Sequence, residues 1–398
     1  MRITVPSSKR RIAIKDDVRR DIQKYDSDNK YPQNLMIIVS NSGTARGCIN
    51  LYSKFIKGAG FTKGGDRIVN KRGENLNKVM GFASEDFAFF GGFALHFNYN
   101  LNYQISTITQ IPFEFCRLGI PDDYNQIAKI AVHKDWAGWT QTIHSSGPKL
   151  GEIDYIDVFN PSPKVIEAQV KKAGGWRNYK GQILYFSRSG HLTYPVPAYD
   201  SVLEDIESDG RIKTYKYKSI ANGFSAFHAF VKKGKFESQE ERDEFVEGLN
   251  TFQGDENAGS TMLVEVDSDE EAPEIQPFEM QKLDGVFDYT EKSIQDNVRR
   301  LFNIPPVLIG DLVVGRLGTA EEILDANILY NAYTSDERTQ IEEVFTRIMK
   351  LFKRPVRGKL EIEPLTIISE ESLIERKSSI PQYEEGTEKR KKETDENE

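Results

Sequence analysis

The pattern of apolar and polar positions is clearest over Asp284–Phe352, where it predicts two helices joined by a loop. Apolar residues recur at helical spacing over Asp288–Phe302, and Pro305–Pro306 then end this helix because proline lacks the backbone N–H. A second, longer helix begins at Thr319 with a capping-box pattern and continues to the end of the stretch. The weak helix formers Thr334–Asp336 predict a kink near its middle.

The connecting segment Val307–Gly318 combines three glycines with an apolar centre. Gly310, Gly315 and Gly318 allow backbone conformations that other residues adopt rarely, so the segment is expected to be a flexible loop. Its centre is formed by Leu312, Val313, Val314, Gly315 and Arg316.

Upstream of this stretch, the periodicity predicts a mixture of helices and strands. Helices are expected over Asp16–Tyr25, Asn41–Phe61, Glu74–Phe90, Lys164–Lys172 and Ser201–Ser208. Strands are expected over Phe93–Tyr99, Tyr103–Ile111, Phe113–Arg117, Ile127–His133, Tyr155–Asn160 and Gly181–Ser187. The fold class that this order indicates is α+β.

Lysines and tyrosines alternate between Ile212 and Phe224, which suggests two interpretations. Cations that meet phosphates, with rings that stack on bases, are typical of nucleic-acid binding. A helix face or an edge strand with solvated lysines gives the same pattern, and this second interpretation is favoured.

The segment between Ser238 and Met280 is polar and poor in apolar anchors. It predicts a polar helix over Ser238–Phe252, a strand over Thr261–Val266, an acidic turn, and a return strand over Ile275–Met280. The carboxylates of this turn are Asp267, Asp269, Glu270, Glu271 and Glu274. Such a unit cannot bury a core of its own, so it is expected to pack against neighbouring subunits.

The residues Asn297–Gly310, a helix end that runs into Pro305–Pro306 and Leu308–Ile309–Gly310, resemble a signature of tailed-phage portal proteins. The helix opening Gly318–Glu322 is similar to the start of the long helix in that family. Two further segments, Gln110–Phe115 and Tyr194–Tyr199, resemble the wing region of portals. The resemblance covers about Asn41 to Phe352 in order and is weakest over Trp136–Gly181.

The resemblance implies a portal-like wing with mixed sheets and helices, a two-helix stem, a small β clip, a long kinked wing helix and a minimal crown. The expected divisions are an N-terminal arm (1–34), the first part of the wing (35–235), stem helix 1 (236–253), the clip (254–285), stem helix 2 (286–304), the tunnel loop with the long wing helix (305–365), and a crown remnant with a disordered charged tail (366–398).

Composition narrows the possible functions. The chain has 398 residues and a net charge of −8, which argues against a sequence-specific DNA binder but not against a DNA conduit. Cys48 and Cys116 are isolated in the sequence, which predicts a reducing compartment, and no apolar run is long enough to cross a membrane. The N-terminus lacks the apolar segment of a secretory signal.

Candidate chemistry is sparse. No phosphate-binding loop, zinc-protease motif or nucleophile elbow occurs, and the five histidines have no metal-ligand spacing. The pairs Asp122–Asp123 and Asp267–Asp269 leave a two-metal nuclease open as an alternative. Acidic pairs are also common in turns, so no catalytic, cofactor-binding or metal residue is assigned.

The resemblance implies a structural subunit rather than an enzyme. About a dozen copies would form a closed ring at one capsid vertex of a virion assembled in the host cytoplasm. Double-stranded DNA would pass through the ring without sequence specificity, and the terminase large subunit, the major capsid protein and head–tail connector proteins would bind to it. The alternative from another class is a different phage head or scaffold protein.

The channel implied by the resemblance is expected to contact three groups of residues. The tunnel loop would project Leu312–Arg316 into the bore. Lys292, Arg299 and Arg300 of the second stem helix would face the channel or a neighbouring subunit. The acidic turn of the clip would form a low-friction rim, because like charges on the wall and on DNA prevent a tight grip.

Overall fold

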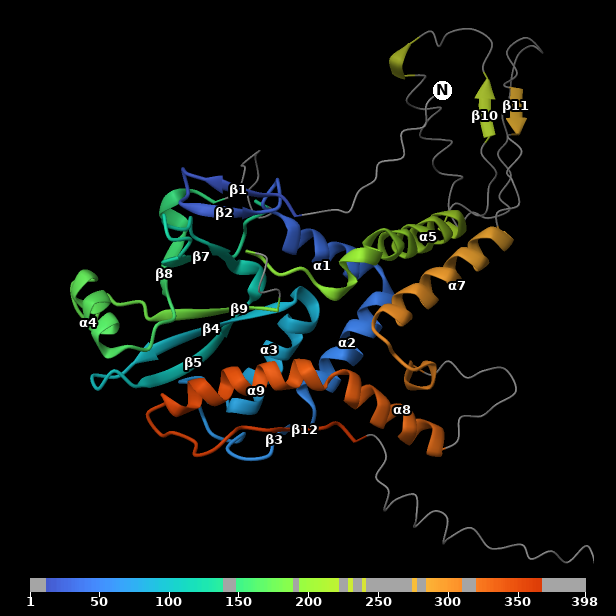
Figure 1. Cartoon of the computed structure of the whole chain (residues 1–398). Coiled ribbons are helices and arrows are strands. Elements are labelled where there is room, and N and C mark those ends of the chain that lie inside the picture. The colour runs from blue at the N-terminus through green and yellow to red at the C-terminus, as the bar shows by residue number, and fades with distance from the viewer. Residues whose placement is uncertain are drawn as a thin grey trace, which may run out of the picture. The chain divides into compact units, whose positions relative to one another are not determined.

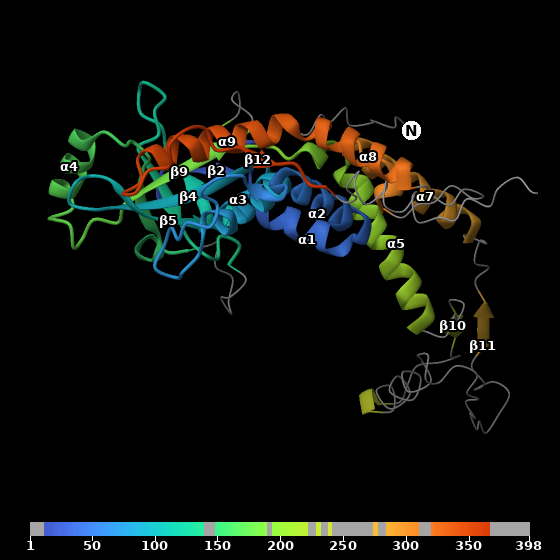
Figure 2. The ribbon, with the colours of Figure 1, turned by 90° about the horizontal axis from the view of Figure 1, so that it is seen from below.

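The computed structural model describes residues 12–138, 148–188, 193–221, 228–231, 238–240, 274–277, 284–309 and 320–366 (Figures 1 and 2). The chain divides into two compact units. The first unit combines residues 1–29, 49–197 and 303–398, and the second combines residues 30–48 and 198–302. The boundary between Cys48 and Ile49 falls inside helix α2 (Gly43–Lys57).

A six-stranded mixed sheet forms the centre of the first unit, in the order β5-β4-β9-β8-β7-β6. Its strands are β4 (Gly92–Tyr99), β5 (Ile105–Ile111), β6 (Cys116–Leu118), β7 (Lys129–Val132), β8 (Asp154–Val158) and β9 (Gln182–Ser187). All neighbours are antiparallel except β8 and β9, which are parallel and connected through helix α4 (Pro163–Lys172). Parallel neighbours need such a crossover because a tight turn cannot join them.

The predicted strands of this sheet are confirmed, with one correction. The expected strand over Phe113–Arg117 begins instead as a short 3₁₀ turn, η1 (Phe113–Phe115), and only Cys116–Leu118 pairs with β7. Pro112 precedes the turn and lacks the N–H that a strand would use. The α+β class predicted from the sequence is confirmed.

Helices α3 (Leu76–Phe90) and α9 (Ser335–Lys350) bury the apolar residues of the sheet. Helix α3 has a cap at each end: the Asn75 side chain accepts the Lys78 N–H, and Gly91 ends the helix in the left-handed region. The ring of Phe93 on β4 lies 4.9 Å from that of Phe186 and 6.4 Å from that of Phe345 on α9. Aromatic packing therefore joins two strands of the sheet to each other and to α9.

A hairpin at the N-terminal side of this unit replaces the helix expected over Asp16–Tyr25. Strands β1 (Ile14–Asp17) and β2 (Ile22–Tyr25) are antiparallel, and Asp21 between them has a φ of 50°. Ile22 and Tyr25 are buried, and Ile22 forms a β-bridge to Gly119. The helix prediction was wrong because long-range pairing to the main sheet, which local periodicity does not contain, decides the conformation.

The Arg117 side chain on β6 is fully buried and holds the hairpin against the sheet. Its guanidinium donates to the side-chain and backbone oxygens of Asn29 at 2.7 and 2.9 Å, and to the carbonyls of Glu114 and Cys116 at 3.0 and 2.8 Å. It also lies 5.2 Å from the centroid of the Trp136 ring. Burial lowers the pKa of Arg117.

The long C-terminal helix is interrupted as predicted. Helix α8 (Ala320–Tyr333) ends and α9 begins on either side of Thr334 (Figure 1). The Arg338 guanidinium donates to the Thr334 hydroxyl at 2.8 Å, to the Asn331 carbonyl at 2.5 Å and to the Phe55 carbonyl at 3.1 Å. These bonds satisfy oxygens near the interruption and fix the kink to α2.

Four short elements belong to the described part of the first unit. Strand β3 (Gly60–Phe61) pairs antiparallel with β12 (Ile362–Glu363). Two 3₁₀ turns, η2 (Leu150–Glu152) and η4 (Pro306–Ile309), lie in the connections, and the second follows Pro305 as the proline stop predicts.

The second unit is built around helices α1 (Tyr31–Asn41), α5 (Leu203–Ala221) and α7 (Asp284–Leu301), with the 3₁₀ turn η3 (Ala198–Val202). Strand β10 (His228–Val231) pairs antiparallel with β11 (Glu274–Pro277), which matches the predicted return strand. Helix α1 was not predicted from the sequence, although Pro32 is compatible with a first helical turn.

The segment Ser201–Phe224 differs from the prediction of a short helix and a separate Lys–Tyr stretch. It forms the continuous helix α5 as far as Ala221. Helical i, i+4 ion pairs hold it, because Arg211 contacts Glu207 at 2.7 Å and Lys213 contacts Asp209 at 2.9 Å.

Gly92 provides a test of the strand packing. A Cβ at this position would lie 2.4 Å from the Phe186 carbonyl oxygen, so Gly92→Ala requires β4 and β9 to separate. We expect this substitution to cost about 2–3 kcal/mol of unfolding free energy. Gly47→Ala in α2 is the control, because nothing lies within 4 Å of its Cβ. The control should gain up to about 1 kcal/mol in denaturant unfolding, and equal losses would contradict the packing described.

Candidate functional site

The predicted site residues fall partly outside the described residues. Leu312, Val313, Val314, Gly315 and Arg316 lie outside them, as do Asp267, Asp269, Glu270 and Glu271. Glu274 is the first residue of β11, where its backbone is paired with Val231. Lys292, Arg299 and Arg300 lie on α7 and are brought together in one helix.

Helix α7 has one buried face and one exposed face. Ile294 and Val298 are buried one turn apart, while Tyr289 is 77% exposed and Lys292 and Arg300 are also exposed. Arg299 is half-buried, and its guanidinium lies 4.0 Å from the Asp296 carboxylate. Its charge also acts on Cys48, whose pKa burial raises to about 11.

Unlike Arg299, the side chains of Lys292 and Arg300 are exposed to solvent. Within the described part of the chain, neither makes an ion pair. They are eight positions apart in the helix, so they are about 12 Å apart along its axis. That spacing exceeds the screening length at physiological salt, so each acts as a separate weak charge. Of the three predicted cations, two are therefore exposed on this face, and Arg299 is half-buried beside Asp296.

Helices α5 and α7 run antiparallel, as their ion pairs show. The Lys216 ammonium lies 2.6 Å from Glu291 and 3.7 Å from Asp288, while Asn297 donates to Asp205 at 3.2 Å. The hydrogen bond to Glu291 raises the pKa of Lys216. Lys213 and Lys216 thus pair with carboxylates inside the unit, which favours the helix-face interpretation of the Lys–Tyr stretch over nucleic-acid binding.

Asp209 fixes the opposite side of α5. Its carboxylate is fully buried, accepts the Ser42 hydroxyl at 2.5 Å and receives the Lys213 ammonium at 2.9 Å. Ser42 also accepts the Ala45 N–H at the start of α2. One buried carboxylate therefore connects the α1–α2 junction to the middle of α5. Sequence reasoning missed this anchor, although the i, i+4 spacing of Asp209 and Lys213 was a readable signal.

The acidic pair Asp122–Asp123 serves the backbone of its own turn. The Asp122 carboxylate accepts the N–H groups of Tyr124 and Gln126 at 3.0 and 2.8 Å. Over the described ranges, no group of three His, Cys, Asp or Glu side chains is placed to hold a metal ion. Over the same ranges, no helix is long and apolar enough to cross a membrane.

Helix α8 in the first unit exposes apolar side chains on its outer face. Ile328, Leu329 and Tyr333 are 54%, 49% and 53% exposed, whereas Ala326 and Tyr330 are buried. A helix with apolar residues around its whole circumference is typical of one that is covered on several sides. This face is the largest cluster of exposed apolar side chains on any one helix among the described residues.

Structural comparison finds chains of similar fold. A chain from the neck of an empty gene transfer agent particle, computed with C6 symmetry, has a TM-score of 0.50 and 13% identity, with 87% of each chain covered. A chain of the native gene transfer agent virion gives 0.48 and 13% identity, also at 87% of each chain. An HK97-family phage portal protein from Corynebacterium diphtheriae gives 0.44 and 11% identity, over 86% of this chain and 97% of that one.

The neck chain of the empty particle therefore shares its overall fold with this protein. The structural similarity to portal and neck chains is the one that the sequence resemblance predicted. No protein-family model matches the chain, and no curated protein matches it in sequence.

The Asp209 anchor can be tested against an exposed pair on the same helix. Asp209→Asn removes the charge that Lys213 and Ser42 contact in a buried site, and we expect it to cost about 2–3 kcal/mol. Glu207→Gln removes the exposed Arg211 pair and should cost less than about 0.5 kcal/mol. Urea unfolding of both variants measures the difference. Equal costs would mean that Asp209 does not anchor α5.

Proposed function

We propose that the chain is a portal-type subunit of a tailed-phage-like particle. In this proposal, identical copies form a closed ring at one capsid vertex, DNA passes through its centre, and terminase, capsid and connector proteins bind its faces. The shared fold with the neck chain is the observation that carries the proposal. The protein acts through geometry rather than through catalysis.

Helices α5 and α7 of the second unit are suited to line such a channel. Lys216 on α5 pairs with Asp288 and Glu291 on α7, whereas Lys292 and Arg300 on α7 make no ion pair among the described residues. Repeated around a ring, they would form two sparse circles of positive charge. Sparse phosphate contacts keep DNA in the bore without holding it in place, because affinity rises steeply with the number of contacts.

The number of copies is expected to be about twelve, from the family resemblance. The neck of the similar particle was computed with sixfold symmetry, and a ring of twelve is compatible with a sixfold axis. A closed ring needs a heterologous interface, in which two different surfaces of the subunit meet. The apolar face of α8 is a candidate for one of them, because a neighbouring copy would bury side chains that are now exposed.

Ring formation is the first test of this proposal. Electron microscopy of the purified protein is expected to show rings with an open centre. The variant I328Q/L329Q/Y333Q should shift the protein to monomers in light scattering, because the α8 face loses its apolar contacts. The variant L101Q/Y124Q/L150Q removes three other exposed apolar side chains and should leave the rings intact. A wild-type protein that is a monomer at all concentrations would refute the portal proposal.

Deletion of Leu312–Arg316 tests the tunnel loop. The shortened protein should still form rings, since the proposed interface lies elsewhere, but particles built from it should lose packaged DNA. Nuclease protection of the DNA in purified particles measures this retention. Failure of the deleted protein to form rings would show that the loop is an interface rather than a gate.

A further inference from the structure

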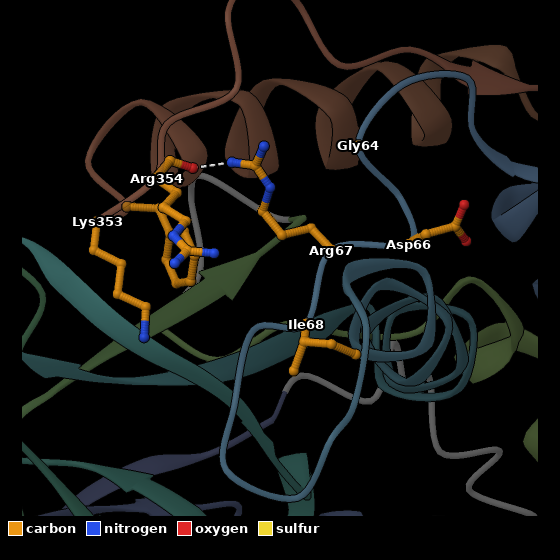
Figure 3. A pocket seen from close by; sticks show the side chains of 7 residues that line it. Gly64, Asp66, Arg67, Ile68, Lys353 and Arg354 are labelled. Atoms are coloured by element: carbon orange, nitrogen blue, oxygen red, sulfur yellow. Dashed lines mark hydrogen bonds between the residues drawn. The ribbon is translucent and has the colours of Figure 1, made fainter.

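A groove in the first unit lies between the loop that follows β3 and the turn that follows α9 (Figure 3). It has a volume of about 610 Å³ and is lined by Gly64, Asp66, Arg67, Ile68, Phe352, Lys353 and Arg354. This volume is typical of ligand-binding clefts. The second unit, whose helix α7 carries the proposed channel face, contributes none of these residues.

The two segments that form the groove are strongly basic in a chain that is acidic as a whole. Residues 62–73 and 353–359 contain eight lysines and arginines and a single acidic residue, Asp66. The complete chain carries a net charge of −8. The positive charge is therefore concentrated in two short segments that the fold brings side by side.

The cations of the groove are not neutralised by carboxylates. Among the described residues, no ion pair involves Arg67, Lys353 or Arg354. Arg67 instead donates to the backbone carbonyl of Arg354, and Figure 3 shows the Asp66 carboxylate pointing away from these three side chains. Lys353 and Arg354 are exposed, Arg67 is half-buried, and all three line the groove.

The backbone that presents these cations is tightly held. The Asn77 side chain accepts the Phe61 N–H at 2.9 Å, and the Asn77 N–H bonds to the Gly65 carbonyl at 2.9 Å. Gly64 adopts a φ of 73°, and a Cβ there would lie 3.1 Å from Val356. On the other side, the Lys353 N–H bonds to Ile105 of β5 at 2.9 Å. Because the backbone is held, only the side chains have to be ordered when an anion binds.

We propose that this groove binds the phosphate backbone of a nucleic acid. Arginine forks bind phosphate through paired N–H groups, and duplex DNA presents about one charge per 1.7 Å of its axis. That density suits several cations gathered in one groove better than the sparser charge of an acidic peptide. The half-exposed Ile68 offers an apolar contact for a sugar beside the phosphates. This inference does not depend on the channel proposal.

The test compares two triple variants of the full-length protein. R67Q/K353Q/R354Q removes the groove cations, and K164Q/K171Q/R177Q removes three exposed cations on and after α4 that make no ion pair among the described residues. Binding of a labelled 30-base-pair duplex is measured by fluorescence anisotropy at several salt concentrations. The groove variant should bind at least tenfold more weakly at moderate salt. Its slope of log K against log salt should fall by about 2–3, because each phosphate contact contributes about 0.9.

Several outcomes would overturn the proposal. They are an equal effect of both variants, no DNA binding by the wild-type protein, and displacement of the duplex by polyglutamate at an equal concentration of charge. The last result would assign the groove to acidic proteins instead. Thermal unfolding of each variant checks its fold, and electron microscopy of rings separates a failure of this site from a failure of the portal proposal.

Discussion

The first unit depends on a buried arginine whose guanidinium donates hydrogen bonds to backbone carbonyls of two separate segments. Arg117 donates to the carbonyls of Asn29, Glu114 and Cys116, which belong to two segments far apart in the sequence. Removing a charge from water is costly, and the cost is offset only when the donors find acceptors in good geometry. The β1–β2 hairpin, the end of β6 and the turn at Asn29 are thereby fixed together. An aliphatic residue at position 117 would leave these oxygens buried without donors.

The second unit combines a few buried apolar residues with ion pairs and hydrogen bonds. Its described apolar core is small, with Ile206, Ile212, Ile294 and Val298 as the central residues of α5 and α7. Ion pairs and hydrogen bonds at Asp209 and Lys216 set the position of α5 against its neighbours. Partly exposed ion pairs contribute little stability, so these polar contacts set the position of the helices more than they stabilise the unit.

Much of the fold was predictable from the sequence where local signals decide the structure. Asn75 and Gly91 mark the two ends of α3, and Thr334 marks the kink of the long helix. Prediction failed where distant residues decide, as at Ile22, whose bridge to Gly119 makes a strand of a segment that resembles a helix. It also failed for the length of α5, which continues as one helix to Ala221 instead of ending at Ser208. The resemblance singled out Lys292, Arg299 and Arg300 on α7. It did not show that Arg299 is half-buried and lies close to Asp296, whereas the other two are exposed.

The two units differ in how their cations are spaced, and this spacing would affect how each of them binds an anionic polymer. On α7, Lys292 and Arg300, which make no ion pair among the described residues, are about 12 Å apart and each is screened from the other. In the groove, Arg67, Lys353 and Arg354 all contribute to one lining. Binding strength depends on how many phosphates are contacted at once. Under the two proposals, the α7 surface would therefore let a polymer slide past, and the groove would hold one.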